Sequence, residues 1–596
     1  MTRRRSTGPL ALLAAVALLV TGIDALAGPA PDPAVVAPTP VEVEPRAGSV
    51  VCAVGLGGPG APPVGLPEVA PPPEPDDEAA VDPDTEAADD DAPEDPDAPD
   101  EGDDTAPEVT GPTPAELVIA RPGGPGSSPA QLERLDLLDD ATLRVDLPAV
   151  FPGGEVRTRG PIDEVTPAAS VVRWRDGAVA VHREWRLDGL DGYPPALVAG
   201  PCARSSAGTH VVPGLSTDGG NEARLRLANP HLSPASVAVR FATPGEPEAP
   251  LALRNISVPP RSVREVVVND TLPERTDLAA LVEVTSGRLA VEGLQLARAA
   301  IGGVDGAALL AATTRPAETW TVPWLADDDA HASWLWVVNR GERTASVELT
   351  LHTEDGGELP LGLSQVSVPE GELRRVDLTG TLPEGVSEVA LTARSNGVPI
   401  VVSGGVARAD EQAERTGLAV QLGAAASGRW VTSGRAGEDR REVLVISNPE
   451  GEMAIVDITL FAGVQAVEPE SLRQVEVPAG SRRLVDLQEA LPASGGWTAF
   501  VSARAGAVVV GRVGSTDGSG PLELVASPAT SSAQWLATSS GLRPTVRPGL
   551  VTQLGTTGSR AGVEVPGGLL RPEEDEPEEG ETDDDGEEPS PDEPAG

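Results

Sequence analysis

The chain has 596 residues and a formal net charge of -48, and 40% of its residues are hydrophobic while only 2% are aromatic. The length allows several domains, and their cores must be built mainly from Val, Leu and Ala. Acidity of this degree disfavours nucleic acid as a partner, because its phosphates would be repelled, and it provides no basic stripe for anionic lipid.

The N-terminal segment 1–27 predicts an export signal. Three arginines precede an apolar run from Leu10 to Val20, and Ala25-Leu26-Ala27 matches a cleavage signature. The apolar run is short for a membrane span, which needs about 20 residues. We therefore favour cleavage after Ala27 over an uncleaved anchor, which would be the only link to a membrane. The mature chain is expected outside the cytoplasm, secreted or associated with the cell envelope.

Two cysteines follow, Cys52 and Cys202. An even number in an exported chain favours one disulfide, and two cysteines allow only one pairing within the chain. The alternatives are two buried free thiols or a lipid-modified Cys52. The disulfide would join an opening strand, SVVCAVG at 49–55, to the end of the first repeat unit.

Acidic residues are concentrated in two tracts. Residues 74–109 hold 18 Asp or Glu and no arginine, and residues 571–596 hold 14 acids against one arginine, so the two tracts supply 31 of the 48 net negative charges. Both are rich in Pro, Ala and Gly and poor in bulky apolar residues, so burial cannot offset the entropy of folding. We predict a disordered acidic insertion at about 57–112 and a disordered acidic tail at 571–596. Solubility and spacing are favoured as their role over binding of cations or of a basic partner.

Four landmarks recur with one period in the rest of the chain. They are an Asn that ends a strand-like run, a Val-Pro pair, a Leu-Pro pair and an upstream aromatic position. The asparagines end the runs RLRLAN, WLWVVN and VLVISN. In order, the landmarks are Asn229, Asn339 and Asn448; Val258, Val368 and Val477; Leu272, Leu382 and Leu491; and His210, Trp320 and Trp430. A shared register of this kind indicates repeated structural units.

Each unit alternates apolar and polar residues with period two, as in SVAVRF and VELTLHT, and turn residues separate these runs. The pattern predicts an all-β chain, a tandem array of Ig-like β-sandwich modules of about 110 residues. A propeller is the weaker interpretation, because its blades have a shorter period of about 40 to about 50 residues. The expected boundaries are a degenerate first module at 48–203 that contains the acidic insertion, modules at 204–313, 314–423 and 424–530, and a terminal strand or cap at 531–570.

The export signal, the cysteine soon after it, and the repeated LxLxN and VPxG units together resemble a family of exported actinobacterial proteins known only as a domain of unknown function. The resemblance covers about residues 48 to 560. It implies a secreted or cell-envelope location and a GC-rich Gram-positive source. It implies no activity.

Residues that could carry chemistry are scattered. The five histidines, at 182, 210, 231, 331 and 352, are spread over three units, without the close spacing that a metal site needs. Asp327-Asp328-Asp329 offers oxygen ligands for calcium, but a solvated acidic turn is the simpler interpretation. We expect no cofactor, no metal and no catalytic residues.

Tryptophan is concentrated in one place, TWTVPWLADDDAHASWLWVVN at 319–339. Trp334 and Trp336 replace the arginines of RLRLAN, whose face of the strand is expected to be the wetter one. Trp324, Trp334 and Trp336 are therefore the candidate interaction patch, with coverage by an adjacent module as the favoured alternative.

The predicted function is that of a non-enzymatic structural or interaction scaffold of the cell envelope, whose partner is an envelope protein or a cell-wall glycan. The alternatives are a glycan-binding protein that uses an exposed Trp patch and an unrecognised secreted hydrolase.

Overall fold

The computed structural model describes about two thirds of the chain. The described residues are 47–54, 115–122, 129–138, 142–160, 168–187, 193–298, 304–410, 415–437, 439–462, 465–516, 523–532 and 534. All of them belong to one compact unit, Glu42–Ser540. The expected signal peptide, acidic insertion and acidic tail, and nearly all of the expected cap, lie outside the described residues. Within the described residues, no helix has the length and apolar character of a membrane span.

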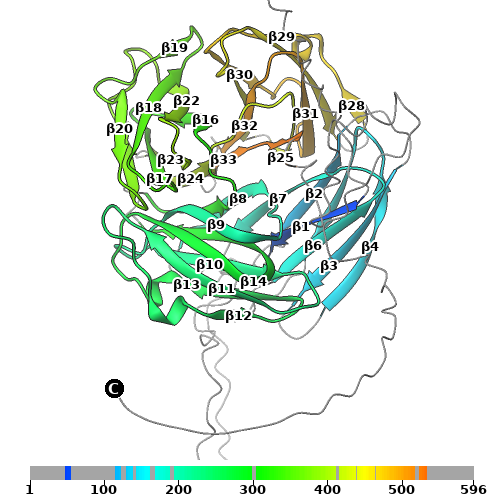
Figure 1. Ribbon diagram of the computed structural model, residues 1–596. Helices are drawn as coiled ribbons and strands as arrows, with labels where there is room; N and C mark the ends of the chain where they lie inside the picture. The colour runs from blue at the N-terminus through cyan, green and yellow to red at the C-terminus, as the bar shows by residue number, and fades with distance from the viewer. Residues whose placement is uncertain are drawn as a thin grey trace, which may run out of the picture. The chain divides into compact units, whose positions relative to one another are not determined.

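The all-β prediction is confirmed: the described chain consists of antiparallel strands and three short 3-10 turns. We divide the strands into four modules, each of which contains whole sheets (Figure 1). Module 1 has two four-stranded sheets, in the orders β1-β6-β3-β4 and β5-β2-β7-β8. Its strands are β1 Ala47–Ala53, β2 Glu116–Arg121, β3 Ala130–Leu137, β4 Thr142–Val150, β5 Gly154–Arg159, β6 Ala169–Arg175, β7 Ala180–Leu187 and β8 Ala196–Pro201.

Module 2 forms one seven-stranded sheet, because the long strand β14 pairs with β11 and β9 through its first half and with β10 and β15 through its second half. Its strands are β9 Ser206–Leu215, β10 Glu222–Asn229, β11 Ala235–Ala242, β12 Ile256–Val258, β13 Ser262–Val267, β14 Leu278–Ala297 and β15 Gly306–Ala311. Two short 3-10 helices, η1 Leu251–Leu253 and η2 Val268–Asp270, lie between them.

Modules 3 and 4 repeat this arrangement with the long strand divided in two, so each has two separate sheets. Module 3 consists of β16 Thr319–Ala326, β17 His331–Asn339, β18 Ala345–His352, β19 Gly357–Glu358, β20 Gln365–Val368, β21 Leu373–Asp377, β22 Glu388–Ser395, β23 Ile400–Asp410 and β24 Arg415–Leu422. Module 4 consists of β25 Arg429–Ala436, β26 Arg440–Ser447, β27 Ala454–Ala462, β28 Gln465–Val467, η3 Glu470–Leu472, β29 Val475–Val477, β30 Arg482–Asp486, β31 Gly495–Ala505, β32 Val509–Thr516, β33 Leu524–Pro528 and β34 Thr530–Ser531.

The recurring asparagine links its strand to the Val-Pro pair of the same unit. Asn339, at the end of β17, is fully buried. Its Nδ2 donates to the carbonyls of Arg343, Val368 and Pro369 at 2.8, 2.9 and 3.0 Å, and its Oδ1 accepts from the backbone N–H of Gly341. Asn229 and Asn448 make the same four bonds in modules 2 and 4. The shared register of Asn and Val-Pro is therefore a hydrogen-bonding requirement of the fold.

Each module is closed by the second residue after its last long strand. Here the chain passes from one sheet to the other, and this residue pairs with the opening strand of its own module. The pairs are Ala203 with Val51, Thr313 with Val211, Ala424 with Thr321, and Thr530 with Val431. Residues 530 and 531 thus complete module 4 as the short strand β34.

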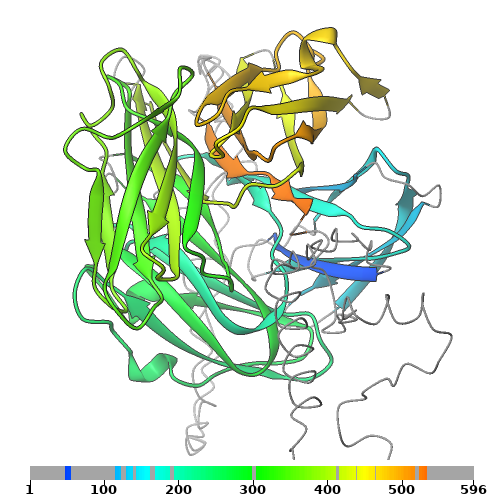
Figure 2. The same cartoon turned by 45° about the horizontal axis from the view of Figure 1, so that its top comes forward.

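The four modules pack against one another in a closed cycle. The last long strand of each module contacts the next: β8 contacts β15, β15 contacts β24, β24 contacts β33, and β33 returns to β8. Figure 1 places β8, β24 and β33 near the centre, and in Figure 2 the orange strand of module 4 lies beside the cyan strands of module 1. The tandem array is therefore closed on itself, and its first and last modules are neighbours.

Candidate functional site

The three tryptophans of the expected interaction patch are buried. The exposed fractions of Trp324, Trp334 and Trp336 are 3%, 1% and 1%. The candidate of an exposed aromatic patch is therefore wrong, and the favoured alternative, in which an adjacent module covers this face, agrees with the burial. The assumption behind it fails as well, because Arg226, on the supposedly wetter face of β10, is itself only 1% exposed.

Trp334 and Trp336 are buried because their face of β17 meets a neighbouring module, whereas Trp324, on β16, contacts Glu388 and His331 within module 3. The indole Nε1 of Trp336 donates to Asp277 Oδ1 of module 2 at 2.8 Å, and a side chain at Gly214 would lie 3.2 Å from its ring. Trp334 packs edge-on against Trp336, with ring centroids 5.5 Å apart, and the guanidinium of Arg375 covers its other side at 4.5 Å. These side chains serve the packing of module 3 on module 2.

The same strand position meets the preceding module in the other units. Arg226 of module 2 lies over the ring of Trp185 of module 1, 5.2 Å from its centroid. Val445 of module 4 belongs to the large apolar core that spans modules 2 and 3. The sequence favoured coverage of Trp334 and Trp336 by an adjacent module, but it did not identify the residues in contact, because an Arg, a Trp and a Val at one repeat position have no common partner.

The two cysteines form the expected disulfide. Cys52 lies in β1 and Cys202 directly follows β8, with their Cα atoms 4.8 Å apart. Next to the disulfide, Val51 and Ala203 exchange two backbone hydrogen bonds of 2.7 and 2.9 Å. The disulfide therefore reinforces the closing bridge of module 1, whose opening strand is separated from β2 by residues 54–115.

In the acidic turn Asp327-Asp328-Asp329 of module 3, the carboxylates of Asp327 and Asp328 accept hydrogen bonds from the same module. Asp328 Oδ1 accepts from the backbone N–H of Ala330 and of His331 and lies 2.9 Å from His331 Nδ1. Asp327 Oδ2 accepts from the backbone N–H of Gly380 at 2.6 Å. Within the described residues, no group of three or more His, Cys, Asp or Glu side chains is arranged to hold a metal ion.

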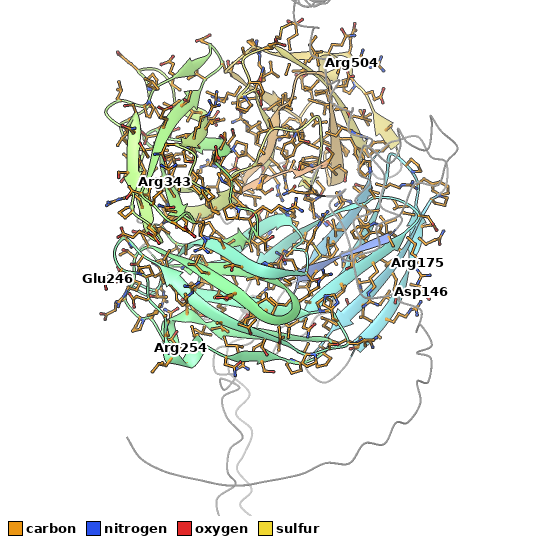
Figure 3. The ribbon with its side chains drawn as sticks, viewed as in Figure 1. Asp146, Arg175, Glu246, Arg254, Arg343 and Arg504 are labelled. Atoms are coloured by element: carbon orange, nitrogen blue, oxygen red, sulfur yellow. A yellow bond between two sulfur atoms is a disulfide. The ribbon has the colours of Figure 1, made fainter. Side chains whose placement is uncertain are left out.

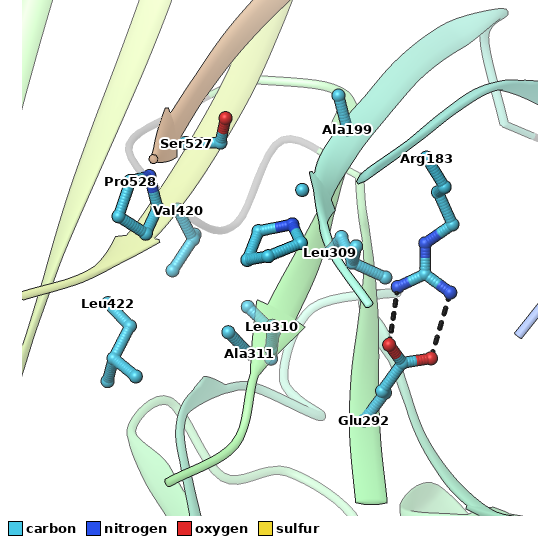
Figure 4. A pocket seen from close by; sticks show the side chains of 12 residues that line it. Arg183, Ala199, Glu292, Leu309, Leu310, Ala311, Val420, Leu422, Ser527 and Pro528 are labelled. Atoms are coloured by element: carbon cyan, nitrogen blue, oxygen red, sulfur yellow. Dashed lines mark hydrogen bonds and ion pairs between the residues drawn. The ribbon is translucent and has the colours of Figure 1, made fainter. Parts of the chain in front are cut away.

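A small cavity lies where the four last strands meet (Figure 4). Its volume is about 10 Å³, which is room for roughly one water molecule. Apolar side chains of β15 and β24 and the prolines Pro201 and Pro528 form most of the wall. Arg183 and Glu292 stand at one side in a bidentate ion pair with two 2.8 Å contacts. This pair joins module 1 to module 2, and the cavity has no room for an organic substrate.

The contact between modules 1 and 4, which we call the closing interface, is built around buried charges. Arg512 donates to both oxygens of Glu442 in its own module and to Glu184 Oε2 of module 1, each at 2.8 Å. Arg440 donates to the other oxygen of Glu184 at 3.2 Å. The side chains of Arg512 and Glu442 are each 1% exposed. Apolar packing is limited here to a small cluster that includes Ala120, Ala180 and Phe500.

The environment of the closing interface shifts the pKa values of two side chains, Glu184 and His182. Burial by itself would raise the pKa of Glu184, but Arg440 and Arg512 outweigh it and lower that pKa to about 2. Burial, followed by the charge of Arg512, lowers the pKa of His182 to about 3, and its Nε2 lies 3.0 Å from Thr530 Oγ1 of module 4. At neutral pH the interface therefore holds ionised Glu184 and neutral His182.

Sequence reasoning did not find these residues, although a signal is present. Arg512 interrupts the apolar run VVVGRVGS, and Glu442 directly precedes the apolar run VLVI. A charge within a strand that is otherwise buried needs a partner. The sequence does not say which one, because Glu184 lies 328 residues away.

One family of proteins matches the chain over more than half of its length. The profile described as "Family of unknown function (DUF5719)" matches residues 164–428 and 410–534. No curated protein matches the chain. Among solved structures, an arabinofuranosyltransferase, AftD, from Mycobacteria is 12% identical, with a TM-score of 0.11. That match covers 66% of this chain and 38% of the other, and at this TM-score it carries no argument about fold or function.

Proposed function

Because the chain belongs to the DUF5719 family, whose function is unknown, we propose its function from its own structure: it is a non-enzymatic scaffold protein that acts outside the cytoplasm. The observation that carries the proposal is the closing interface. Arg512 and Arg440 of module 4 hold Glu184 of module 1, so the two ends of the repeat array are bound together. Such closure fixes the surface loops of the four modules relative to one another. Fixed loops suit a scaffold protein that binds partners through its surface.

Location outside the cytoplasm is supported by two features. The N-terminal segment 1–27 has the pattern of an export signal. The Cys52–Cys202 disulfide requires an oxidising compartment to form and persist. Fractionation, together with the intact mass of the mature chain, tests this part of the proposal. A chain that stays in the cytoplasm with reduced cysteines would refute it.

The scaffold role is tested by photo-crosslinking in cells from exposed apolar side chains on modules 2 and 3. Leu232, Leu251 and Leu359 are 74%, 76% and 61% exposed, and each is replaced in turn by a photoreactive residue. We expect adducts with an envelope protein or a cell-wall glycan. The adducts should weaken when Arg512→Met loosens the closing interface, and they should persist in Arg504→Gln, which breaks only the exposed pair with Asp457.

Two results would count against the scaffold. The first is the absence of adducts from every surface position of the exported chain. The second is turnover of a wall polysaccharide or peptide by the purified chain, which would favour a secreted hydrolase. Adducts with glycan alone would favour a glycan-binding protein, whose contact surface would lie elsewhere than at the buried tryptophans.

A further inference from the structure

Five basic side chains gather where module 1 joins module 2, around the linker Ala203–Ser206. They are Arg173, Arg204, His231, Arg288 and Arg315, and we call them the basic junction. Arg315 is exposed and the other four are half-buried. A local group of positive charges contrasts with the net charge of -48 of the whole chain.

Backbone pairing and hydrogen bonds bring these residues to one region. Ser205 Oγ lies 3.0 Å from His231 Nε2, and Arg173 Nη2 donates to the carbonyl of the adjacent Pro230 at 3.4 Å. Ser206 pairs with Leu289, the neighbour of Arg288. On the other side, Val211 of the same strand pairs with Thr313, whose hydroxyl accepts from the backbone N–H of Arg315 at 3.1 Å.

The positive charges act on one another. Burial, followed by the charge of Arg315, lowers the pKa of Arg204 to about 10. Burial, followed by the charges of Arg288 and Arg173, lowers the pKa of His231. At Arg204 and His231 the charges of neighbouring basic groups therefore add to burial in opposing ionisation.

Carboxylates compensate these charges little within the part of the chain that the structure describes. Glu133 lies opposite Arg173 in the pairing of β3 with β6, but its ion pair is with Arg144. None of the four arginines forms an ion pair there, whereas other arginines, such as Arg224 with Glu222 and Glu265, are fully engaged. An oxyanion would remove the repulsion and supply the charged acceptors that these guanidinium groups lack, and Arg suits phosphate and carboxylate through its planar fork of donors.

We infer that the basic junction binds a polyanion, a polymer with repeated phosphate or carboxylate groups. The geometry favours a polymer over a single small anion, because the arginines fall into two groups, Arg173 with Arg288 and Arg204 with Arg315, joined by an extended linker. Successive oxyanions of one polymer can engage both groups. The net acidity of the chain does not prevent this, because salt screens charges beyond about 8 Å at physiological ionic strength.

The inference rests on the proposed function only for the location of the polymer, which would be a component outside the cytoplasm. Binding itself depends on the surface and is measured on the purified full-length chain. Failure of export would therefore leave the binding result intact. Failure of binding would leave the scaffold proposal intact.

The test is titration of the full-length chain at physiological ionic strength with linear polyphosphate and, separately, with polygalacturonate, so that phosphate and carboxylate are distinguished. The junction variant is Arg204→Gln/Arg288→Gln/Arg315→Gln. The matched control is Arg254→Gln/Arg343→Gln/Arg504→Gln, three exposed arginines on modules 2, 3 and 4 that are labelled in Figure 3. Both triple variants remove three positive charges, so they separate the junction from net charge.

We expect at least one polymer to bind, with an affinity about tenfold weaker in the junction variant than in the control, and with binding that weakens as salt rises. Equal affinities of the two variants, or no binding by the wild-type chain, would overturn the inference. Binding that appears only after deletion of residues 74–109 would also overturn it, because the occupant would then be the acidic tract of the chain itself. Thermal unfolding of both variants shows that any loss of binding is not a loss of fold.

Discussion

At the scale of single residues, the buried asparagine is the most informative position of the repeat. Asn339 satisfies three backbone carbonyls and one backbone N–H that the turn and the Val368-Pro369 pair would otherwise leave without partners. An amide side chain suits this role because it offers two donors and an acceptor on a short stem. Buried backbone groups that lose their partners are costly, which explains why the same residue recurs in three modules.

Replacement of Asn339 with alanine should lower the free energy of unfolding by about 3 kcal/mol, because buried carbonyls lose their donor. Asn339→Asp should be at least as harmful near neutral pH, since it retains the shape but turns an acceptor toward the carbonyls. Denaturant unfolding measures both. The control is Asn396→Ala, whose exposed side chain accepts a single bond from Ser346. An Asn339→Ala variant as stable as this control would contradict the assigned role.

At the scale of elements, the opening strand of module 1 is the one that most needs support. In modules 2 to 4 only a few residues separate the opening strand from the next strand of the chain. In module 1, residues 54–115 separate β1 from β2. Bringing the ends of such a long segment together costs entropy. The Cys52–Cys202 disulfide lowers this cost, and it does so beside the bridge that closes every module.

Removal of the disulfide with Cys52→Ser/Cys202→Ser should destabilise module 1. The disulfide spans 150 residues, and the chain-entropy model assigns a loop of that length about 5 kcal/mol. Calorimetry should show a lower unfolding temperature, and limited proteolysis should release β1 first. Reduced wild-type chain is the matched control and should behave in the same way. If the double variant unfolds like the oxidised wild type, the disulfide does not stabilise β1.

At the scale of the whole compact unit, the module contacts differ in chemistry. Modules 2 and 3 share one continuous apolar core, which Val445 and Leu524 of module 4 also join. Modules 1 and 4 meet instead through Arg512, Arg440 and their carboxylate partners, with little apolar surface. Buried ion pairs are a weak source of net stability but are costly to break. The closing interface should therefore be the contact that is most sensitive to single substitutions.

Arg512→Met should lower the stability by about 3 to 5 kcal/mol, because Glu442 and Glu184 lose a buried partner. The double variant Arg512→Met/Glu442→Met should recover part of this loss, because it removes one of the stranded carboxylates. Small-angle scattering should show a larger particle for the single variant if modules 1 and 4 separate. The control Arg504→Gln, in an exposed pair, should remain close to wild type. A harmless Arg512→Met would show that the closing interface does not depend on this residue.

Acid should weaken the closing interface in a defined pH range. Unfolded His182 takes up a proton near pH 6.5 but folded His182 only near pH 3, so the unfolded state binds more protons between these values. The free energy of unfolding should therefore fall as the pH drops from 6.5 to 3, by up to about 1.4 kcal/mol per pH unit from this residue. Glu184 adds a further loss from pH 4.5 to 2.

The pH prediction is checked with His182→Gln, which cannot titrate. Its free energy of unfolding, measured by denaturant titration at each pH, should fall less steeply than that of the wild type between pH 6.5 and 3. The remaining slope would come in part from His210, whose pKa burial lowers to about 4. Identical slopes in the variant and the wild type would show that His182 does not control the acid response.

Much of the local structure could be predicted from the sequence. Period-two alternation, turn residues and the recurring Asn and Val-Pro landmarks predicted β-sandwich modules, because these features depend on contacts within a single unit of the repeat. The pairing of Cys52 with Cys202 followed from their number and from the expected compartment. The Trp patch could not be judged in this way: alternation shows that Trp334 and Trp336 share a face of a strand, but not whether that face meets water or another module.

The sequence by itself therefore determined what each unit is, and only the tertiary structure decided how the units meet. The closing interface joins Glu184 to Arg512 across 328 residues, and no periodicity links the two positions. Whether four sandwiches form an extended array or a closed cycle depends on the shape and charge of surfaces that come together only after each module has folded. Burial of Trp334 and Trp336, neutral His182 and the grouping of the arginines in the basic junction all result from that packing.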